Sequence, residues 1–584
     1  MKYYTVSITT ALTFDLLKPI FKIDIFAAKI LNESFQMRYF LISAFLIFSL
    51  KGFSQKVANF PSEKPKIVIG IVIDQMRYDY IYKYWDKYEN NGFKRLINEG
   101  SSCKNANFNY MFTNSNSGFA TISTGANPSA HGIISDNWYV QLTDKIINCT
   151  KDEQVQCIGG DKDNDCGQHS PSKLLASTLG DEIKLATYKQ SKVVSVSLEP
   201  SAAILSAGHI ANAAYWFDVN SGNFVTSSTY LKELPQWVKD FNNRKFSDTY
   251  LSEKWTKLLP DSLYFESLPD NNRYEEGLRG IKVFPYDLNL MSLKSNGKRD
   301  YSLLKFTPNG NNITKDFAIS AIVNENMGKD DYVDFLSVNF SATEYISQAF
   351  GLNSIEMEDA YIRLDKEIQH LLNFLDSYIG KGNVLVYLTS NHGAVYSPKY
   401  MTDLGVPSGY FNTGQAMALL KSYLNVTYGK GDWVKYYNNQ QLFLNHNLIQ
   451  DSKIPLEKIQ DDISQFLLQF SGVTNVITST MFQKTNYTTG IFSKMQNSFN
   501  QKRSGDLMIN LEPGWTEYND ASTGHNSAYT YDTHVPLIFY GWKINRQTIY
   551  DPIDIIDIAP TIALFLDIAY PNACQGKPII QLIK

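Results

Sequence analysis

Neither sign of charge dominates this sequence, and long apolar runs are rare in it. Its 584 residues include 54 Lys and Arg against 58 Asp and Glu, which leaves a net charge of −4. A protein with this balance has no general attraction for nucleic acid or for anionic membranes. Beyond the first 50 residues, no apolar run approaches the roughly 18 residues that a membrane-spanning helix needs. We therefore expect no nucleic-acid partner and no transmembrane span in the mature protein.

Cysteine is scarce as well. The chain has 5 cysteines, and none of them is spaced as a CxxC pair, which excludes a zinc site of the ribbon or finger type. Cys149, Cys157 and Cys166 lie close together in the sequence, whereas Cys103 and Cys574 are isolated. One or two disulfides are compatible with this number, and the spacing alone does not decide the pairing.

The N-terminal region has the pattern of a secretory signal peptide. A basic start at Met37–Arg38 leads into an apolar run over residues 39–50, and small residues Gly52 and Ser54 precede Gln55. This is the order of a signal peptide with its cleavage site, and the apolar run is short for a membrane span. The pattern therefore predicts export to the periplasm or the cell surface. An N-terminal membrane anchor is the alternative.

The predicted organisation follows from this signal. Residues 1–36 are expected to be an upstream extension, with translation starting at residue 37, and residues 37–54 the signal peptide. Residues 55–584 are then the mature domain. Within it, residues from about 210–325 and 400–500 are rich in Tyr, Asn, Ser and Lys and poor in long apolar runs. We expect these two regions to be capping insertions.

Apolar runs of strand length alternate with helical patterns in the rest of the chain. The clearest helix is predicted from Ile355 to about Tyr378, where apolar residues recur every three or four positions. Such alternation favours an α/β fold with a central, mostly parallel sheet flanked by helices. The predicted strands are Ile67–Ile73, Lys192–Ser197, Val333–Val338, Val384–Leu388 and Val535–Tyr540.

Polar side chains follow several of these strands directly. Asp74 comes after the first strand, and the strand over 384–388 leads into Asn391-His392-Gly393. Ser115 stands before a run of small residues that starts a helix, where backbone N–H groups favour an anion. In α/β sheets, ligands bind at the carboxyl ends of the strands. These residues are therefore the first candidates for a functional site.

Longer motifs strengthen that interpretation. They occur in order between Lys66 and Ile580: VIDQMRYDYIYKYWDKYENNGFKRL, STGANPSAHGI followed by DNWY, GLNSIEMEDAYIRLDKEIQHLL, LTSNHGA, YDTHVPLIFYG and DIAPTIALFLDIAYPNACQGKPI. Together they resemble the alkaline phosphatase superfamily, in particular the bacterial periplasmic phosphate-irrepressible alkaline phosphatases and the type I phosphodiesterase/nucleotide pyrophosphatases. The resemblance implies an alkaline-phosphatase-like fold and a two-zinc phosphate-ester hydrolase that uses a Ser or Thr nucleophile.

The resemblance also implies roles for individual residues. It assigns metal binding to Asp74, Glu344, Gln348, Asn391, His392 and His525. Relatives carry Asp, His and Asp where this chain has Glu344, Gln348 and Asn391, and the neutral amides of Gln and Asn are weak zinc ligands. One metal pocket would keep His525 with Glu344, and the other would keep Asp74, His392 and Ser115.

The remaining assigned positions concern the substrate. Ser115 falls on the nucleophile position, where the nearest relatives have Thr. Asp136, Glu199 and Ser201 fall on substrate-binding positions where relatives have Asn, Lys and Arg. Two of these replacements place a carboxylate where phosphate would bind.

Three functions remain open from the sequence. The first is an exported phosphatase homologue with weak or lost activity, a pseudoenzyme that holds one zinc ion or none. The second is an active, divergent hydrolase with an altered metal site and a different ester as substrate. The third is a non-catalytic binding or scaffold protein. A phosphate ester or another small molecule is the expected ligand, and no protein partner is indicated.

Overall fold

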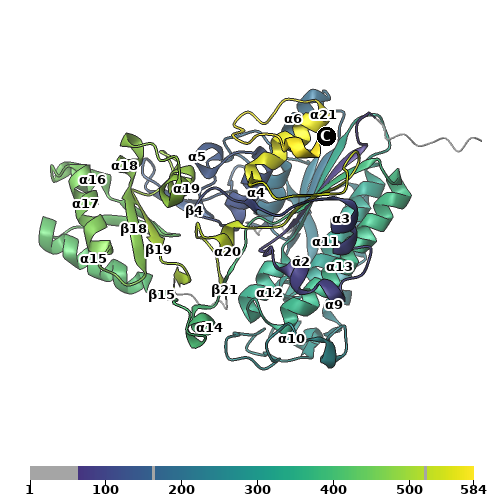
Figure 1. Ribbon diagram of the computed structural model, residues 1–584, viewed down its shortest axis with the longest axis horizontal. Coiled ribbons are helices and arrows are strands. Elements are labelled where there is room, and N and C mark those ends of the chain that lie inside the picture. The colour runs from purple at the N-terminus through teal and green to yellow at the C-terminus, as the bar shows by residue number, and fades with distance from the viewer. Residues whose placement is uncertain (1–62, 161–164, 518–522, 584) are drawn as a thin grey trace, which may run out of the picture. The chain divides into compact units, whose positions relative to one another are not determined.

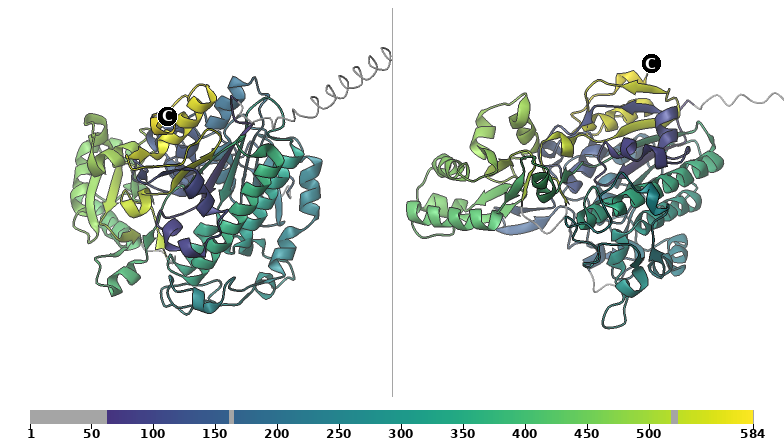
Figure 2. Two further views of the ribbon diagram at one scale, coloured as in Figure 1. Left: turned by 45° about the vertical axis from the view of Figure 1, so that its right-hand side comes forward. Right: turned by 60° about the horizontal axis from the view of Figure 1, so that its bottom comes forward.

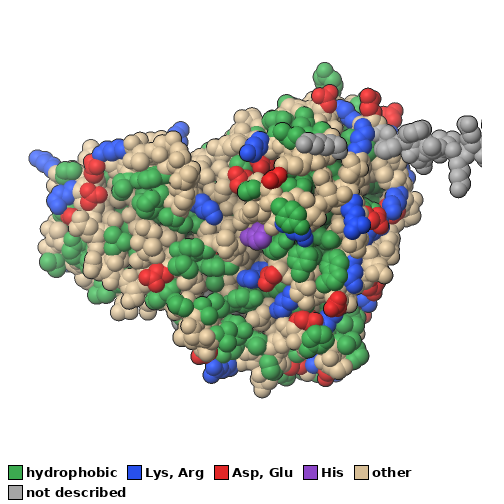
Figure 3. Space-filling model, in the orientation of Figure 1, with side chains coloured by type: hydrophobic (Ala, Val, Ile, Leu, Met, Phe, Trp, Pro, Cys, Tyr) green, Lys and Arg blue, Asp and Glu red, His purple; other side chains and the backbone are tan. Residues whose placement is uncertain are grey.

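The computed structural model describes residues 63–160, 165–517 and 523–583. The predicted upstream extension and signal peptide, residues 1–54, lie outside the described residues. None of the helices in the described part of the chain combines the length and the hydropathy of a membrane span. Figure 3 shows acidic and basic side chains interspersed on one face of the molecule, as expected from the balanced charge.

A ten-stranded sheet forms the centre of the fold (Figure 1), with the order β23-β2-β22-β13-β1-β12-β7-β8-β9-β6. The five strands from β13 to β8 run parallel, and antiparallel strands flank them on both sides. The parallel strands are β13 (Val384–Thr389), β1 (Ile67–Ile73), β12 (Asp334–Phe340), β7 (Val193–Ser197) and β8 (Ala213–Asp218). The flanking strands are β23 (Gln547–Ile549), β2 (Ser101–Cys103), β22 (Leu537–Gly541), β9 (Asn223–Ser227) and β6 (Cys157–Ile158). The mostly parallel α/β sheet predicted from the sequence is confirmed.

The central strand β1 shows why this sheet needs helices on both faces. All seven residues of its IVIGIVI sequence are buried, as is typical of parallel strands covered on both sides. Its odd-numbered residues belong to one hydrophobic core and Val68 and Val72 to another. Gly70 has no side chain because a Cβ there would lie 2.3 Å from the hydroxyl oxygen of Tyr387 on the neighbouring strand.

Two layers of helices supply these cores (Figure 2). One core contains residues of α3 (Phe93–Glu99), α11 (Asn309–Asn324), α12 (Ala342–Phe350) and α13 (Ile355–Leu375). The other contains residues of α4 (Ser115–Thr124), α6 (Leu179–Ala186), α7 (Pro200–Ala207) and α21 (Ile558–Leu566). The helix predicted over residues 355–378 is α13, whose last turn continues as a π-helical turn over Asp376–Gly380.

The structure places part of the first expected insertion, residues 210–325, in the central fold. Residues 213–227 form β8 and β9 of the main sheet, and α11 packs against it. The sequence of β8, AAYWFD, is entirely buried, so its aromatic residues belong to the core and not to a cap. The intervening stretch carries α8 (Gln236–Asn243), α9 (Phe246–Leu251), β10 (Lys254–Trp255), β11 (Tyr286–Asp287) and α10 (Leu288–Ser292).

Residues 400–511 form a second, smaller sheet with its own hydrophobic core. Its order is β16-β17-β19-β18, and two amphipathic helices cover it. The bounds are α15 (Thr413–Tyr428), β16 (Val434–Asn438), β17 (Gln441–Leu444), α17 (Leu456–Leu467), β18 (Val473–Thr478) and β19 (Leu507–Leu511). The side chain of Asn438 donates to the carbonyl of Asn137, which starts β4 (Asn137–Val140) of the main fold, at 2.9 Å. This contact attaches the smaller sheet beside the candidate site.

Candidate functional site

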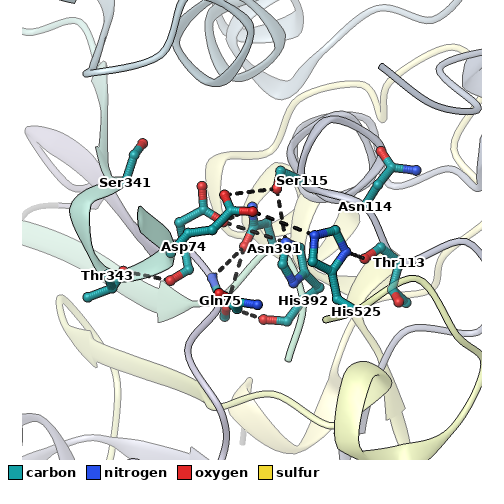
Figure 4. Close-up of polar contacts among 12 residues, drawn as sticks. Asp74, Gln75, Thr113, Asn114, Ser115, Ser341, Thr343, Asn391, His392 and His525 are labelled. Carbon is teal, nitrogen blue, oxygen red and sulfur yellow. Dashed lines mark hydrogen bonds and ion pairs between the residues drawn. The ribbon is translucent and has the colours of Figure 1, made fainter. Parts of the chain in front are cut away.

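Most candidate residues come from three neighbouring parallel strands. Asp74 follows β1, Glu344 lies in the first turn of α12 just after β12, and Asn391 and His392 follow β13. Because parallel strands end at the same edge of a sheet, these side chains meet there although up to 318 positions separate them in sequence. Figure 4 shows Asp74, Asn391 and His392 facing one another at this edge.

Ser115 begins helix α4 and points into the same group (Figure 4). Asn114 caps this helix, and its side-chain oxygen accepts from the backbone N–H of Ser117 at 2.9 Å. The hydroxyl oxygen of Ser115 lies 3.0 Å from His392 Nε2 and 3.2 Å from Glu344 Oε2. Helix α4 can approach this closely because Gly118 has no side chain, and a Cβ there would lie 2.1 Å from the carbonyl oxygen of Asn391.

His392 is fully buried, and its orientation is fixed by the backbone. Its Nδ1 lies 2.7 Å from the carbonyl oxygen of Gly393, which can only accept, so Nδ1 carries the proton and Nε2 presents a lone pair. That nitrogen faces Ser115 and also lies 3.6 Å from Asp74 Oδ1. Burial, followed by the charge of His525, lowers the pKa of His392 to about 3. His392 is therefore a neutral imidazole at neutral pH.

His525 completes the group from a distant loop. Its Nδ1 lies 3.0 Å from the carbonyl oxygen of Thr113, its Nε2 lies 3.6 Å from Glu344 Oε1, and its ring stacks on that of His392 with 4.1 Å between centroids. One ligand atom from each of Glu344, His392 and His525 lies within 4.8 Å of the others. The sequence interpretation had placed His392 with Asp74 and Ser115 in a separate pocket. In the structure His392 lies next to Asp74 and Ser115 and also next to Glu344 and His525, so the two expected pockets share it.

Ionisation within this group follows from the pairing. Burial opposes the charge on Glu344, but its ion pair with His525 and the nearby histidines outweigh burial and lower its pKa to about 2. Burial also opposes the charge on His525, and the ion pair with Glu344 outweighs it and raises the pKa of His525. The pKa of Asp74 is raised well above its usual value by burial and then by Glu344. Glu344 and His525 thus form the charged pair of the site.

Two carboxamides bind the carboxylates of the site directly. Asn391 Nδ2 donates to Asp74 Oδ1 at 2.6 Å, while Asn391 Oδ1 accepts from the backbone N–H of Gln75 at 3.1 Å. Gln348 lies one turn after Glu344 on α12 and donates from Nε2 to Glu344 Oε1 at 3.0 Å. Each of these two carboxylates therefore accepts a hydrogen bond from a side-chain amide.

The expected substrate-binding residues lie beside this group, with partners of their own. Asp136 accepts from Asn116 Nδ2 at 2.6 Å. It is accessible to water, yet enough protein surrounds it that lost hydration, and then the charge of Glu344, raise its pKa. Glu199 precedes α7 and accepts from Lys305 and, at 2.6 Å, from the hydroxyl of Tyr345.

Ser201 is half-buried in the first turn of α7. Of the three positions expected to bind substrate, it is the one whose side chain has no hydrogen bond or ion pair to another side chain within the described residues.

Several supporting residues were not identified from the sequence. Thr343 Oγ1 donates to the carbonyl of Asp74 at 2.6 Å, and the carbonyl of Thr113 orients His525. Tyr345 directly follows Glu344 in the sequence, and this neighbouring position could have marked it as a residue of the site. Lys305 lies 106 positions from Glu199, and nothing in the sequence connects the two.

The residues present fit one divalent metal ion and not a pair. Glu344, His392 and His525 supply one oxygen and two nitrogens within 4.8 Å of one another, a donor set that zinc accepts. A second ion would need Asp74 and Asn391. Asn391 turns an N–H toward Asp74, and an amide nitrogen offers no lone pair to a metal.

Comparison with known proteins identifies relatives over most of the chain. The family model for type I phosphodiesterase / nucleotide pyrophosphatase matches residues 68–535. A protein of Myroides odoratus named calcium-transporting ATPase is 41% identical over 531 residues, 89% of this chain and 95% of its own. Alkaline phosphatase PafA of Elizabethkingia meningoseptica is 39% identical over 524 residues, with the same coverage. These names describe different activities, so activity has to be argued from the site.

A solved structure supports the fold. The crystal structure of wild-type alkaline phosphatase PafA is 39% identical in sequence and superposes with a TM-score of 0.85. The match covers 89% of this chain and 99% of the solved one. The alkaline-phosphatase-like architecture expected from the motifs is therefore confirmed for the central sheet and its helices.

Proposed function

Since this chain belongs to the type I phosphodiesterase / nucleotide pyrophosphatase family of the alkaline phosphatase superfamily, as its motifs indicated, we propose that it is an exported phosphate-ester hydrolase homologue with an impaired site. In this proposal the site holds at most one divalent metal ion, and phosphatase activity is weak or lost. The family assignment rests on the comparisons, and the impairment rests on the site geometry.

The observation that carries the impairment is the pair of amide hydrogen bonds. Asn391 and Gln348 each donate an N–H to a carboxylate that the family would use for metal binding, at 2.6 and 3.0 Å. Each bond occupies one lone pair of the carboxylate and places an amide, a weak zinc ligand, where the resemblance expects a family metal ligand. A two-metal site stabilises both the attacking and the leaving oxygen of phosphoryl transfer. Losing one of its two ions removes one of those two contributions.

The charges around the site act in the same direction. Glu199 and Asp136 stand where relatives carry a cation and a neutral amide. A carboxylate about 4–5 Å from a phosphate costs on the order of 3 kcal/mol at an effective dielectric of about 20. Lys305 and Tyr345 bind Glu199 and so offset its charge for the fold. They do not supply a free cation for phosphate.

One metal ion remains compatible with the site. Glu344, His392 and His525 would hold it, and it would act as a Lewis acid on a bound oxygen. Without it, the Ser115 hydroxyl lies within hydrogen-bond distance of both Glu344 Oε2 and His392 Nε2 and can donate its one proton to either. The protein's own residues can therefore hold and orient a ligand hydroxyl or carbonyl in either state.

The test measures metal content and hydrolysis together. Purified protein is analysed for zinc by elemental analysis, and its turnover of an aryl phosphate is compared with that of PafA under the same conditions. We expect at most one zinc per chain and turnover lower by several orders of magnitude. Two zinc ions per chain with turnover near that of PafA would refute the impairment.

Export is a separate part of the proposal. It rests on the signal-peptide pattern over residues 37–54. N-terminal sequencing of the protein secreted by its host should begin at Gln55. A cytoplasmic protein that retains residues 37–54 would contradict export and leave the argument about the site unchanged.

A second candidate function is hydrolysis of a different ester. The contact that favours it is the 3.0 Å distance from the Ser115 hydroxyl to His392 Nε2, the arrangement of an activated nucleophile. An uncharged carboxylic ester or an aryl phosphodiester carries less negative charge than a phosphomonoester into this acidic site. Turnover of either that disappears in Ser115→Ala would favour the divergent hydrolase. No turnover of any ester would leave a non-catalytic binding protein.

A further inference from the structure

Two of the five cysteines lie at one edge of the main sheet, away from the candidate site. Cys157 begins β6, the end strand of the ten-stranded order, and pairs with Ser227 on β9. Cys166 lies in the short helix η2 (Asp165–Gly167), and its carbonyl accepts from the indole N–H of Trp216 on β8 at 2.7 Å. The backbone at each cysteine is therefore held by the sheet. Residues 161–164, between the two cysteines, lie outside the described residues.

The two sulfur atoms converge on one point. A Cβ built on Gly160 would lie 2.6 Å from Cys166 Sγ and 2.7 Å from Cys157 Sγ. A Cβ built on Gly167 would lie 2.1 Å from Cys157 Cα and 2.8 Å from its Sγ. The sequence thus has glycine at both positions where a side chain would enter the space between the sulfurs. Sulfurs this near each other come within bonding distance after small side-chain rotations.

These two thiols are also the accessible ones of the cluster. Both are half-buried, and Cys157 lines an open cavity of about 400 Å³ together with Lys232, Leu234 and Lys239. Cys149, the third cysteine of this stretch, is only 1% exposed, and burial raises the pKa of its thiol. A buried thiol with a raised pKa reacts slowly because the thiolate is the reactive form.

We propose that Cys157 and Cys166 form a disulfide, with a small-molecule disulfide as the oxidant. The Cys157 thiolate attacks one sulfur of that reagent, which releases one small thiol and leaves a mixed disulfide on Cys157. The Cys166 thiolate then attacks the Cys157 sulfur and releases the second small thiol. Two protein thiols are oxidised and one reagent disulfide is reduced, so atoms and electrons balance.

The cross-link would tie η2 to the end strand of the sheet. End strands expose unpaired backbone N–H and C=O groups, and proteins commonly cover them with a loop or a helix. Here η2 lies against β6, and a covalent bond between Cys157 and Cys166 would hold it in place. The cross-link would lie at the β6 end of the sheet, whereas the candidate site lies at the carboxyl ends of β1, β12 and β13, so it is independent of phosphatase activity.

Trypsin offers a direct test because Lys162 lies between the two cysteines. Cleavage at Lys151, Lys162 and Lys173 places Cys157 in the peptide 152–162 and Cys166 in the peptide 163–173. Protein is purified with its thiols blocked by alkylation, and a second sample is reduced and then treated with oxidised glutathione before blocking. We expect mass spectrometry to find the two peptides joined in the oxidised sample and separated after dithiothreitol.

Cys149 is the internal control, since it falls in a third tryptic peptide, residues 146–151. It should be found as an unlinked thiol, alkylated after denaturation in both samples. Cys166→Ser should abolish the joined peptide and leave Cys157 of the oxidised sample carrying glutathione as an unresolved mixed disulfide. Cys157→Ser should also abolish the joined peptide and leave Cys166 unlinked to any other cysteine. The proposal is overturned if glutathione leaves both thiols alkylated, or if either cysteine is joined to Cys149, Cys103 or Cys574 instead.

Discussion

Replacing Asn391 by Asp tests the proposal that an amide at this position keeps a second metal ion out of the site. The side-chain Oδ1 of residue 391 accepts from Gln75 N, and an aspartate keeps that acceptor. The other end changes from an N–H that donates to Asp74 at 2.6 Å into an oxygen that faces it. The substitution therefore exchanges one hydrogen bond for a carboxylate pair and leaves the shape of the side chain unchanged.

The cost of that exchange can be bounded. Two unit charges about 3 Å apart repel by roughly 5 kcal/mol at an effective dielectric of about 20. Taking up a proton at pH 8 instead costs a similar amount, about four pKa units at about 1.36 kcal/mol each. Burial and then Glu344 raise the pKa of Asp74, so protonating it costs less than protonating an ordinary carboxylate and the loss is smaller. We expect Asn391→Asp to lower the free energy of unfolding by about 2–5 kcal/mol without metal.

Zinc should reverse this loss, because a cation between two carboxylates replaces their repulsion by attraction. A ligand present at about 100 times its dissociation constant adds roughly 2.7 kcal/mol to the folded state. The assay is chemical denaturation of wild type and variant at pH 8, each with a chelator and with added zinc. Zinc should stabilise the variant by more than it stabilises the wild type.

Asn391→Leu is the matched control for this prediction. It removes the hydrogen bonds to Asp74 and Gln75 without adding charge, so the variant should be destabilised but gain no more from zinc than the wild type. The reasoning is refuted if Asn391→Asp equals the wild type in stability under chelation, or if zinc stabilises both proteins equally.

Three further predictions concern the surroundings of the site and a remote carboxyl. Restoring all the groups that the family resemblance expects should yield measurable phosphomonoesterase activity in an aryl-phosphate assay. Lys305 must be replaced as well, because Glu199→Lys alone would place two ammonium groups side by side. Each single change should have little effect. The restored set is Glu344→Asp, Gln348→His, Asn391→Asp, Asp136→Asn, Glu199→Lys and Ser201→Arg. Lys305→Met should lower the free energy of unfolding by about 1–3 kcal/mol in urea, because it leaves Glu199 without its cation, whereas exposed Lys298→Met should not. Burial and then Glu356 raise the pKa of Glu275 to about 9, so the native state keeps a proton that the unfolded state loses. The free energy of unfolding should therefore fall as the pH rises from about 4.5 to 9. In urea titrations over this pH range, Glu275→Gln should flatten the fall, whereas Glu276→Gln, at the exposed neighbouring position, should not.

The sequence alone was sufficient for the features that local pattern controls. The run IVIGIVI predicted a strand buried on both faces, and the 3–4 residue repeat after Ile355 predicted a long helix, because burial periodicity and backbone conformation are coupled within a few residues. Asp74, Asn391 and His392 could be marked as site candidates for the same reason, since they directly follow strands. Where composition masked the alternation, as in the aromatic strand β8, the strand itself was not predicted.

The tertiary structure decided which of those residues touch. That Asn391 donates to Asp74, that Lys305 reaches Glu199, and that His392 stacks on His525 are contacts between positions 106 to 317 apart in sequence. Hydrogen-bond geometry is set within tenths of an ångström by packing of distant helices and strands, and no local propensity encodes it. The family resemblance of the sequence implied replaced metal- and phosphate-binding groups, and only the folded chain showed that Asn391 and Gln348 bind Asp74 and Glu344 and that Lys305 binds Glu199.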